Sequence, residues 1–345
     1  MKKWLYATIT LLLLGGLFVG YYYESSRTTL PPRISSQPTP PEYPVTAIPL
    51  AAPVSDSDSE LSGLAWYGDY LILLPQYPER FDKQLFALPK ADILSFLDGQ
   101  LSGPLTPFPI PLNASNLTEE ISWFEGFEAI GFVDEQLFVT IEAHSGHAMV
   151  GYLVSGTVAP DLSQIELESS TLAEIPAQSD ISNASDETLL IADDRVITIY
   201  EANGENVNSA PVVHQFKKNL TSLDEISFPN IEYRVTDATT LDAENRFWVI
   251  NYLFPGSIDK LKPASDPLFT EYGVGSTHAE QETVERLLEL HYSEAGITLT
   301  DRAPVQLQLS EESRNWEGLA RLDERGFLLV SDKFPETILG FVSYP

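Results

Sequence analysis

The sequence contains no cysteine and few basic residues, and both shortages limit what the protein can do. Without cysteine the chain can form no disulfide, no thiolate metal site, no cysteine nucleophile and no lipid-modified cysteine. Lysine and arginine together number 20, against 50 aspartate and glutamate residues, and the formal net charge is -30. Such a chain is repelled by nucleic acids and by anionic lipid surfaces. We therefore expect no nucleic-acid partner.

Long apolar runs are scarce, and the one that could span a bilayer lies at the N-terminus. Lys2 and Lys3 precede an apolar stretch over residues 4–23, about 20 residues, the length of a membrane-spanning helix. Tyrosines rather than a small-x-small cleavage site follow Gly20, so we favour an uncleaved anchor over a signal peptide.

This pattern divides the chain into three parts. We expect a signal anchor at residues 1–23, a linker rich in Pro, Ser and Thr at 24–44, and a globular domain at 45–345. The two lysines would keep the N-terminus in the cytoplasm. The expected location is the cytoplasmic (inner) membrane, crossed once, with the globular domain on the extracytoplasmic, periplasmic side.

A short motif recurs along the globular part: an acidic or small polar residue, then Gly or Ala, then an apolar run typical of a β-strand. The motif starts lie 54 to 80 residues apart, a spacing that indicates a repeat architecture. A polar turn and a second β-branched or aromatic run follow each motif, as in a hairpin. The sequence therefore predicts an all-β chain with a β-propeller fold. The motifs begin at Ser62-Gly63, Glu125-Gly126, Asn183-Ala184, Asp237-Ala238 and Glu317-Gly318.

The repeats predict five blades, with six as the alternative and a two-sheet sandwich as a more distant one. The interval between Asp237 and Glu317 is the longest and could contain a sixth blade, and residues 279–290 within it also fit an amphipathic helix. The chain stops after the third strand of its last unit. We therefore expect residues 43–53 to add the fourth strand and close the ring. Third strands are expected at residues 84–88, 148–154, 286–292 and 337–342.

The motifs place two groups of oxygen-bearing side chains around the expected propeller axis, at the start of each first strand and at the end of each second strand. Neither group contains Lys, Arg or His, which suits calcium, and unpaired carboxylates would need a cation or shifted pKa values. The alternative is that these residues only cap turns. The predicted calcium ligands are Glu125, Asp237, Glu317 and Asp332, and the predicted ligand-binding residues are Ser62, Gln76, Asn183, Glu201 and Asn251.

The first and last units carry a resemblance to a known family. The motifs are Leu61-Ser62-Gly63-Leu64-Ala65, Glu125-Gly126-Phe127, Asn315-Trp316-Glu317-Gly318-Leu319-Ala320 and the run from Phe327 to Asp332. This pattern resembles the phytase-like, esterase-like propeller family. The resemblance implies an extracytoplasmic, calcium-dependent propeller that hydrolyses ester or phosphoester bonds. The sequence departs from the family at Gln76, where such proteins tend to carry an acidic residue.

Two functional classes fit these features. The favoured one is a non-catalytic module that binds a small-molecule or protein ligand on its acidic face. The alternative is a calcium-dependent ester or phosphoester hydrolase, in which the ion polarises an oxygen and Glu125, Glu142 or Glu317 activates water. The absence of clustered basic residues argues against a highly phosphorylated substrate, because several phosphates need several cationic partners.

Overall fold

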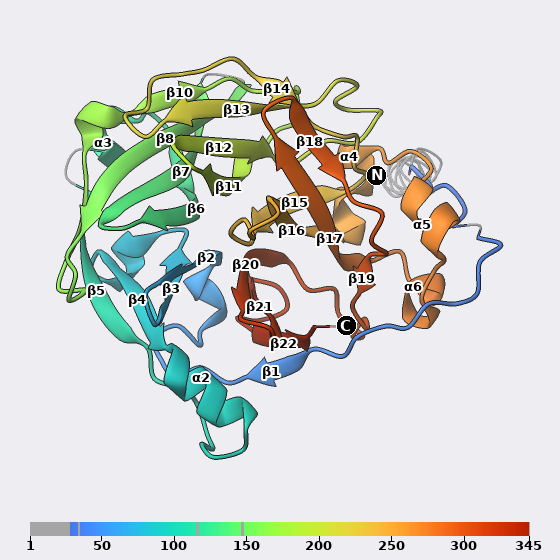
Figure 1. Cartoon of the computed structure of the whole chain (residues 1–345), viewed down its shortest axis with the longest axis horizontal. Coiled ribbons are helices and arrows are strands. Elements are labelled where there is room, and N and C mark those ends of the chain that lie inside the picture. The colour runs from blue at the N-terminus through green and yellow to red at the C-terminus, as the bar shows by residue number, and fades with distance from the viewer. Residues whose placement is uncertain (1–27, 34, 115–116, 146–147, 345) are drawn as a thin grey trace, which may run out of the picture.

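The computed structural model describes residues 28–344 except for 34, 115–116 and 146–147. The chain is an all-β, propeller-type structure in which antiparallel strand units surround a centre (Figure 1). The expected anchor at residues 1–23 lies outside the described residues. Within the described ranges, no helix is both long and apolar enough to cross a membrane.

The first sheet consists of two antiparallel four-stranded units that meet at their outer edges. The outer strands β5 and β9 pair in parallel over only two residue pairs, Leu112 with Ile165 and Asn113 with Glu166, so the units remain distinct. A short strand, β10, also pairs with β8. In sheet order the strands are β2 (Leu61–Tyr67), β3 (Tyr70–Pro75), β4 (Gln84–Pro89), β5 (Phe108–Asn113), β9 (Ile165–Leu167), β8 (Ala148–Val158), β7 (Gln136–Ser145) and β6 (Phe124–Val133), and β10 is Ala173–Ile175.

The second sheet repeats this arrangement. Its two units touch where β14 and β18 pair in parallel at a single position, Ser227 with Gly296. Strand β19 pairs separately with β17. In sheet order the strands are β11 (Asp186–Ala192), β12 (Arg195–Tyr200), β13 (Val212–Lys217), β14 (Ile226–Ser227), β18 (Gly296–Leu299), β17 (Val284–Ser293), β16 (Arg246–Leu253) and β15 (Arg234–Ala238), and β19 is Val305–Gln306.

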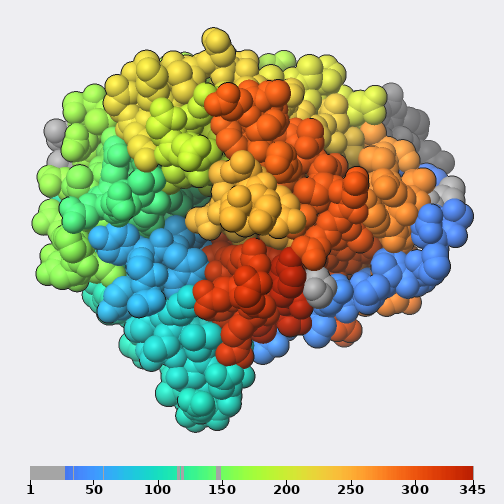
Figure 2. Space-filling model, in the orientation of Figure 1, coloured from blue at the N-terminus to red at the C-terminus, as the bar shows by residue number. Residues whose placement is uncertain are grey.

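The third sheet combines the start and the end of the described chain. Strand β1 lies antiparallel to β22, with Thr46 opposite Phe341 and Ile48 opposite Leu339. The space-filling view shows the N-terminal segment in blue beside the C-terminal unit in red (Figure 2). In sheet order the strands are β1 (Thr46–Ile48), β22 (Leu339–Ser343), β21 (Gly326–Ser331) and β20 (Trp316–Leu322).

The innermost strands β2, β6, β11, β15 and β20 contact one another in this order, and β20 contacts β2. Apolar side chains fill the space between neighbouring units. For example, Leu64 of β2, Leu328 of β21 and Ile48 of β1 belong to one buried cluster. Because both faces of most units pack against neighbours, the strands read as continuous apolar runs rather than as strict alternation.

The predicted hairpins and third strands are present, whereas the helix considered for residues 279–290 is wrong. Helix α6 ends at Glu280, and residues 284–293 form β17, which pairs with β16 from end to end. The helices are α2 (Lys90–Leu97), α3 (Leu117–Glu120), α4 (Ile258–Leu261), α5 (Pro267–Tyr272) and α6 (Ser276–Glu280), and short 3₁₀ turns span residues 57–59, 78–81, 169–171 and 255–257.

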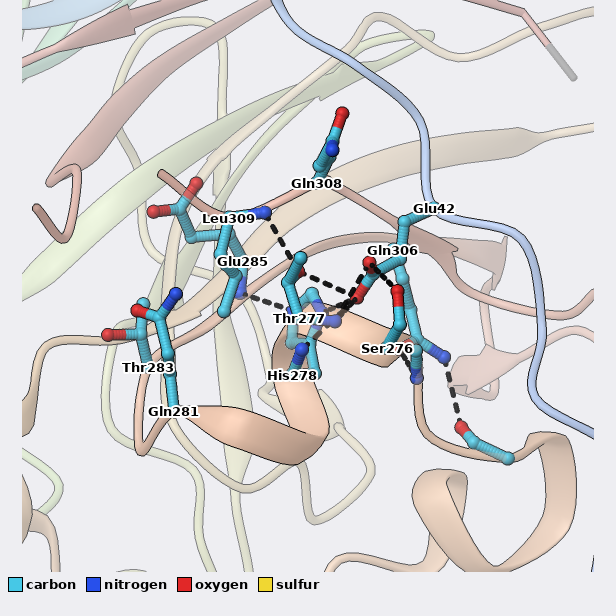
Figure 3. A network of polar contacts seen from close by, with 12 residues as sticks. Glu42, Ser276, Thr277, His278, Gln281, Thr283, Glu285, Gln306, Gln308 and Leu309 are labelled. Atoms are coloured by element: carbon cyan, nitrogen blue, oxygen red, sulfur yellow. Dashed lines mark hydrogen bonds and ion pairs between the residues drawn. The ribbon is translucent and has the colours of Figure 1, made fainter. Parts of the chain in front are cut away.

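The N-terminal segment at residues 28–50, which we call the strap, is bound to the domain and does not run free as the linker expected at 24–44 would. The guanidinium of Arg33 donates to the backbone oxygens of His278 (2.6 Å) and Gln281 (2.7 Å). The carboxylate of Glu42 accepts hydrogen bonds from Thr277 N (3.0 Å) and His278 Nδ1 (2.7 Å), among others (Figure 3). The strap therefore crosses from β1 to the α5–α6 region.

Candidate functional site

A polar cavity of about 260 Å³ lies among the starts of the innermost strands. We call it the acidic cavity. A smaller, mostly apolar hollow of about 70 Å³ is formed by residues further along the same strands, such as 64–66 and 130–132. The carboxylates therefore gather at one end of these strands, whereas Thr239, Thr240 and Arg321 are the polar residues among those lining the second hollow. The carboxylates that line the acidic cavity are Glu125, Glu128, Glu142, Glu187, Glu317 and Asp332.

A β-bulge occurs at the same place in all five innermost strands. The register with the second strand shifts between Leu61 and Gly63 in β2, and equivalent shifts occur in the other four strands. A bulge inserts an extra residue and re-aims its side chain, so it can turn one residue toward the axis. The residues at these matching bulges, which we call the bulge positions, are Ser62, Glu128, Glu187, Thr236 and Glu317; β6 has a second shift, at Glu125.

Two of the bulge positions fasten neighbouring innermost strands to each other. Ser62 Oγ donates to the backbone oxygen of Phe127 (2.6 Å), the residue before Glu128. Thr236 Oγ1 donates to the backbone oxygen of Trp316 (2.7 Å), the residue before Glu317. Both hydroxyls thus hold the backbone at the point where the next strand presents its carboxylate.

The three carboxylates at the bulge positions are buried and repel one another. Burial, followed by repulsion from Glu142 and, more weakly, Glu317, raises the pKa of Glu128 well above its usual value. Burial and repulsion from Glu201 and Glu317 do the same to the pKa of Glu187. The pKa of Glu317 rises to about 8, mainly through burial. Folding thus assembles carboxyl groups whose ionised forms it does not compensate, so they hold their protons to higher pH.

Arg234 is the only basic side chain among the described residues that line the acidic cavity. Its Nε lies 2.9 Å from Glu201 Oε2, and its Nη1 lies 3.9 Å from Oε1 of both Glu187 and Glu317. Burial alone would lower the pKa of this guanidinium, but these carboxylates and Tyr252 outweigh it and raise the pKa. The expectation that no basic residue enters the site is therefore wrong. One guanidinium nevertheless faces an excess of carboxylates.

Three further acids line the cavity: Glu125 is partly exposed, Asp332 is half-buried and Glu142 is buried. Glu142 is only 3% exposed, and its Oε1 has no hydrogen-bond partner among the described residues. Burial and then repulsion from Glu201 raise its pKa to about 7, and burial raises the pKa of Asp332 to about 6. Glu125 is 41% exposed and lies 3.7 Å from His144 Nε2. We call Glu125, Glu142 and Asp332 the mouth acids.

The structure brings most of the predicted site residues together. Glu201 is buried behind the lining, where it pairs with Arg234. Gln76 Nε2 donates to Glu128 Oε1 (3.1 Å), and the backbone oxygen of Asn183 accepts from Lys260 Nζ (2.7 Å). The predicted residues that line the acidic cavity are Ser62, Gln76, Glu125, Glu142, Asn183, Glu317 and Asp332.

Two predicted residues have structural roles instead. The carboxylate of Asp237 accepts the backbone amides of Leu319 (2.7 Å) and Ala238 (2.8 Å), so it joins β15 to β20. Asn251 donates to two backbone oxygens and accepts from Arg286 Nε (2.7 Å). Neither side chain lines the acidic cavity. Each sits one position away from a side chain that faces the axis, because alternate residues of a strand point to opposite faces.

The sequence reading missed Glu128, Glu187 and Arg234, although a usable signal exists for the first two. Four of the five bulge positions lie six residues before the first residue of the hairpin turn, and Thr236 lies six residues before Asp242, which directly precedes its turn. Counting back from the turns would have selected the correct positions, whereas the Gly/Ala motif drifts by up to four residues between units. The pairs are Ser62 and Gly68, Glu128 and Asp134, Glu187 and Asp193, Thr236 and Asp242, and Glu317 and Asp323.

Comparisons with known proteins add little to this description. No protein-family model matches the chain, and no curated protein matches it. Among solved structures, a hypothetical protein from Leishmania major is 11% identical, with 94% of each chain covered and a TM-score of 0.46. An endo-arabinase from Bacteroides thetaiotaomicron is 8% identical, with 88% of this chain and 98% of that one covered and a TM-score of 0.45. A Bombyx mori β-fructofuranosidase is 10% identical, with 88% and 60% covered and a TM-score of 0.45. Similarities of this size carry no argument about function.

Proposed function

We propose that this protein is a propeller-type binding module whose acidic cavity holds a divalent cation such as calcium. The observation that carries the proposal is that Glu128, Glu187 and Glu317, buried carboxylates from three different units, line one cavity beside a single guanidinium. Among the described residues no three acidic or histidine side chains already lie close enough together to hold a metal ion, so binding would draw these carboxylates together. Carboxylates in such a place must either become protonated or gain a cation. A divalent ion at the bulge positions would supply that charge.

The donor set suits calcium better than a softer metal. Calcium takes about six to eight oxygen ligands, including carboxylates, amide oxygens and water. Here the carboxylates are joined by the hydroxyl of Ser62 and by Asn183, and no sulfur or imidazole lines the described part of the cavity, as zinc would prefer. Of the calcium ligands expected from the sequence, we keep Glu317 and replace Asp237 by Glu128 and Glu187. The other two expected ligands, Glu125 and Asp332, belong to the mouth acids.

We further propose that the fold is a five-bladed propeller closed by β1. The closed order of contacts among β2, β6, β11, β15 and β20 supports five units. The parallel pairings between outer strands are too short to merge two units into one. Strand β1 supplies the fourth strand of a unit that otherwise has three. Such closure protects sheet edges and fixes the five bulge positions around one axis.

The membrane location stays a proposal that rests on residues 1–23. If that segment is the anchor, the propeller lies on the periplasmic side. Because Thr28 N already donates to Asp259 Oδ1 (2.7 Å), only residues 24–27 would separate the anchor from the domain. Four extended residues reach about 14 Å, so the propeller would stay close to the bilayer.

A hydrolase acting on ester or phosphoester bonds is the second candidate, and Glu142 is the observation that favours it. A carboxylate with a pKa of about 7 and a free oxygen is suited to accept a proton from water at neutral pH. A bound calcium would supply polarisation of an acyl or phosphoryl oxygen. Glu125 at the mouth and Glu317 at the bulge are less suited, because the first is exposed and the second is paired with Tyr252 Oη (2.8 Å).

Calorimetric titration of calcium into the chelator-treated, full-length protein in detergent tests the metal proposal. We expect one saturable site, and Glu187→Gln should weaken it at least about tenfold, because one charged ligand is lost. Glu294→Gln is the matched control, since that side chain is 83% exposed. No saturable binding by the unmodified protein would overturn the proposal.

Turnover of a generic aryl acetate and aryl phosphate separates the two functions. A binding module gives no calcium-dependent turnover. A hydrolase gives turnover that Glu142→Gln abolishes while calcium affinity changes little.

A further inference from the structure

We propose that the mouth of the acidic cavity binds a small organic cation, namely an ammonium group with alkyl substituents. The site consists of the mouth acids together with the aromatic side chains around them. It goes beyond the divalent-cation site, whose ligands are the carboxylates at the bulge positions.

The cavity has room for more than a metal ion. One water molecule needs about 10–15 Å³ on the same measure, and the cavity measures about 260 Å³. An ion held at the bulge positions and its water ligands would fill only part of this volume. The remaining space is bounded by the mouth acids and by Tyr77 and Phe254.

The charge of the mouth selects a cation. The Oε1 atom of Glu142 is buried without a hydrogen-bond partner in the described part of the chain, so a ligand could supply the missing contact. Asp332 and Glu125 add two further carboxylates. Arg234 is the only basic side chain that lines the described part of the cavity, and it is already held 2.9 Å from Glu201. Two lysines nearby are also engaged, because Lys260 donates to the backbone oxygen of Asn183 (2.7 Å) and Lys333 pairs with Glu60 (2.8 Å). An anionic ligand such as a phosphate would therefore be repelled at this end of the cavity.

Aromatic rings beside the mouth select alkyl substituents on that cation. Phe254 lines the cavity and stacks on Phe334, with ring centroids 6.5 Å apart and planes 20° apart, and Phe334 is 52% exposed. Trp123, two residues before Glu125, is 74% exposed. Aromatic faces attract alkylated ammonium groups, and combining them with carboxylates is the usual chemistry of such sites.

The backbone at Trp123 supports a binding role for its ring. Its φ of 59° lies in the left-handed region, which bulky residues rarely adopt. The backbone oxygen of Trp123 accepts the amide of His144 (3.0 Å), which ties this conformation to the strand that carries Glu142. An unfavourable conformation that holds a large apolar ring in solvent is explained if the ring meets a ligand.

Calorimetry with choline as the probe tests this inference on the full-length protein in detergent. The matched probe is the neutral isostere of choline, in which a quaternary carbon replaces the nitrogen. We expect choline to bind saturably and the isostere to bind at least about tenfold more weakly, because only the charged probe gains the ion pair and the cation–π contacts.

Three variants locate the site. Trp123→Ala and Glu142→Gln should each weaken choline binding about tenfold. Leu101→Ala is the control, because Leu101 is also an exposed apolar side chain (40%) but lies beyond α2, away from the mouth. Trp123→Ala changes an exposed residue, so its result does not depend on repacking of the core.

The titrations are made both in chelator and in saturating calcium, which keeps the two proposals separable. Glu187→Gln should weaken calcium binding at least about tenfold and leave choline binding in chelator intact. Equal affinity for choline and its isostere would overturn the inference, as would unchanged choline binding in Trp123→Ala. No choline binding at about 10 mM, an affinity weaker than about -3 kcal/mol, would do the same.

Discussion

Two regions of the molecule bury glutamate, and they affect it in opposite ways. In the strap, burial would raise the pKa of Glu42, but hydrogen bonds from His278 and Thr277 outweigh it and lower the pKa to about 2. In the acidic cavity, burial and neighbouring carboxylates raise the pKa of Glu128 well above its usual value. The side chain of Glu42 is 5% exposed, and the whole residue Glu128 is 6% exposed. Glu42 accepts hydrogen bonds from several donors, whereas Glu128 has one side-chain donor and several neighbouring carboxylates.

The donors at Glu42 come from one short segment of the fold. Both carboxylate oxygens accept hydrogen bonds from residues 276–278, and His278 donates from Nδ1 while its Nε2 accepts the amide of Glu285 (3.2 Å). His278 is therefore neutral, and burial lowers its pKa to about 4. Folding satisfies this carboxylate fully, as expected for a structural group.

The acidic cavity differs because its carboxylates outnumber its donors. Gln76 donates to Glu128, and Tyr252 donates to Glu317, but Arg234 is shared among several groups. A carboxylate that folding leaves short of partners marks a place where a bound species completes the structure. The comparison thus distinguishes a structural glutamate, Glu42, from glutamates that belong to the candidate site.

The largest expected effect is a loss of folding stability when Arg234 is replaced in the acidic cavity. Arg234→Met should destabilise the fold by about 3–5 kcal/mol in chelator, because it leaves Glu201 buried without its cation. Calcium should restore part of the loss, since it binds the folded state only. Denaturant unfolding measures both. Arg325→Met is the control: its partner Asp98 is 43% exposed, and the transition should not move measurably. An unmoved transition in Arg234→Met as well would mean that the carboxylates need no cation.

The next effect concerns the strap. Glu42→Ala removes the acceptor for several donors, and we expect a loss of about 2–3 kcal/mol, with a smaller loss for Glu42→Gln, which keeps an acceptor oxygen. Limited proteolysis should then cleave the strap near Arg33 more readily. Calcium affinity should not change. A lower calcium affinity in Glu42→Ala would contradict the view that the strap and the acidic cavity are independent.

The sequence predicted the strand pairs but not the strap. Apolar runs and polar turns are local signals, so the hairpins and the strand at 284–293 could be read directly. The strap could not, because its Pro- and Ser-rich composition is typical of a linker and the donors to Glu42 lie 234 to 236 residues away in the sequence. Such contacts depend on the ring having assembled.

The sequence predicted a site rich in carboxylates but did not identify all of the residues that line it. Oxygen-rich residues at the strand starts were expected, and Glu317 lines the acidic cavity. Glu125 and Asn183, expected because each precedes Gly or Ala, line the acidic cavity, but Glu128 and Glu187 line it too, and Asp237 lies one residue past the bulge residue Thr236 and does not line it. A one-residue slip in a strand turns a side chain to the other face. Arg234 lies outside the motif and gave no signal.

The pH dependence of stability should separate the two regions by sign. The folded pKa values of Glu42 and His278 are lowered, so the stability they give is complete above about pH 6.5 and is lost as the pH falls through about 4 and then about 2. The pKa values of Glu142 and Glu317 are raised to about 7 and about 8, so stability is lost as the pH rises from about 4.5 through those values.

Thermal unfolding between about pH 4 and pH 9 in chelator measures this difference. The melting temperature should pass through a maximum in weak acid, and calcium should remove the decline on the alkaline side, because the ion stabilises the ionised carboxylates. A melting temperature that rises steadily to pH 9 in chelator would contradict the account of the cavity.

The most direct test of the central claim, that the bulges of separate units converge on one ion, is a double-mutant cycle on calcium affinity. Glu128→Gln and Glu317→Gln should each weaken calcium binding at least about tenfold. Because both carboxylates would contact the same ion, the double variant should lose less affinity than the sum of the two single losses. Losses that add fully, or single variants that bind calcium like the unmodified protein, would contradict the claim.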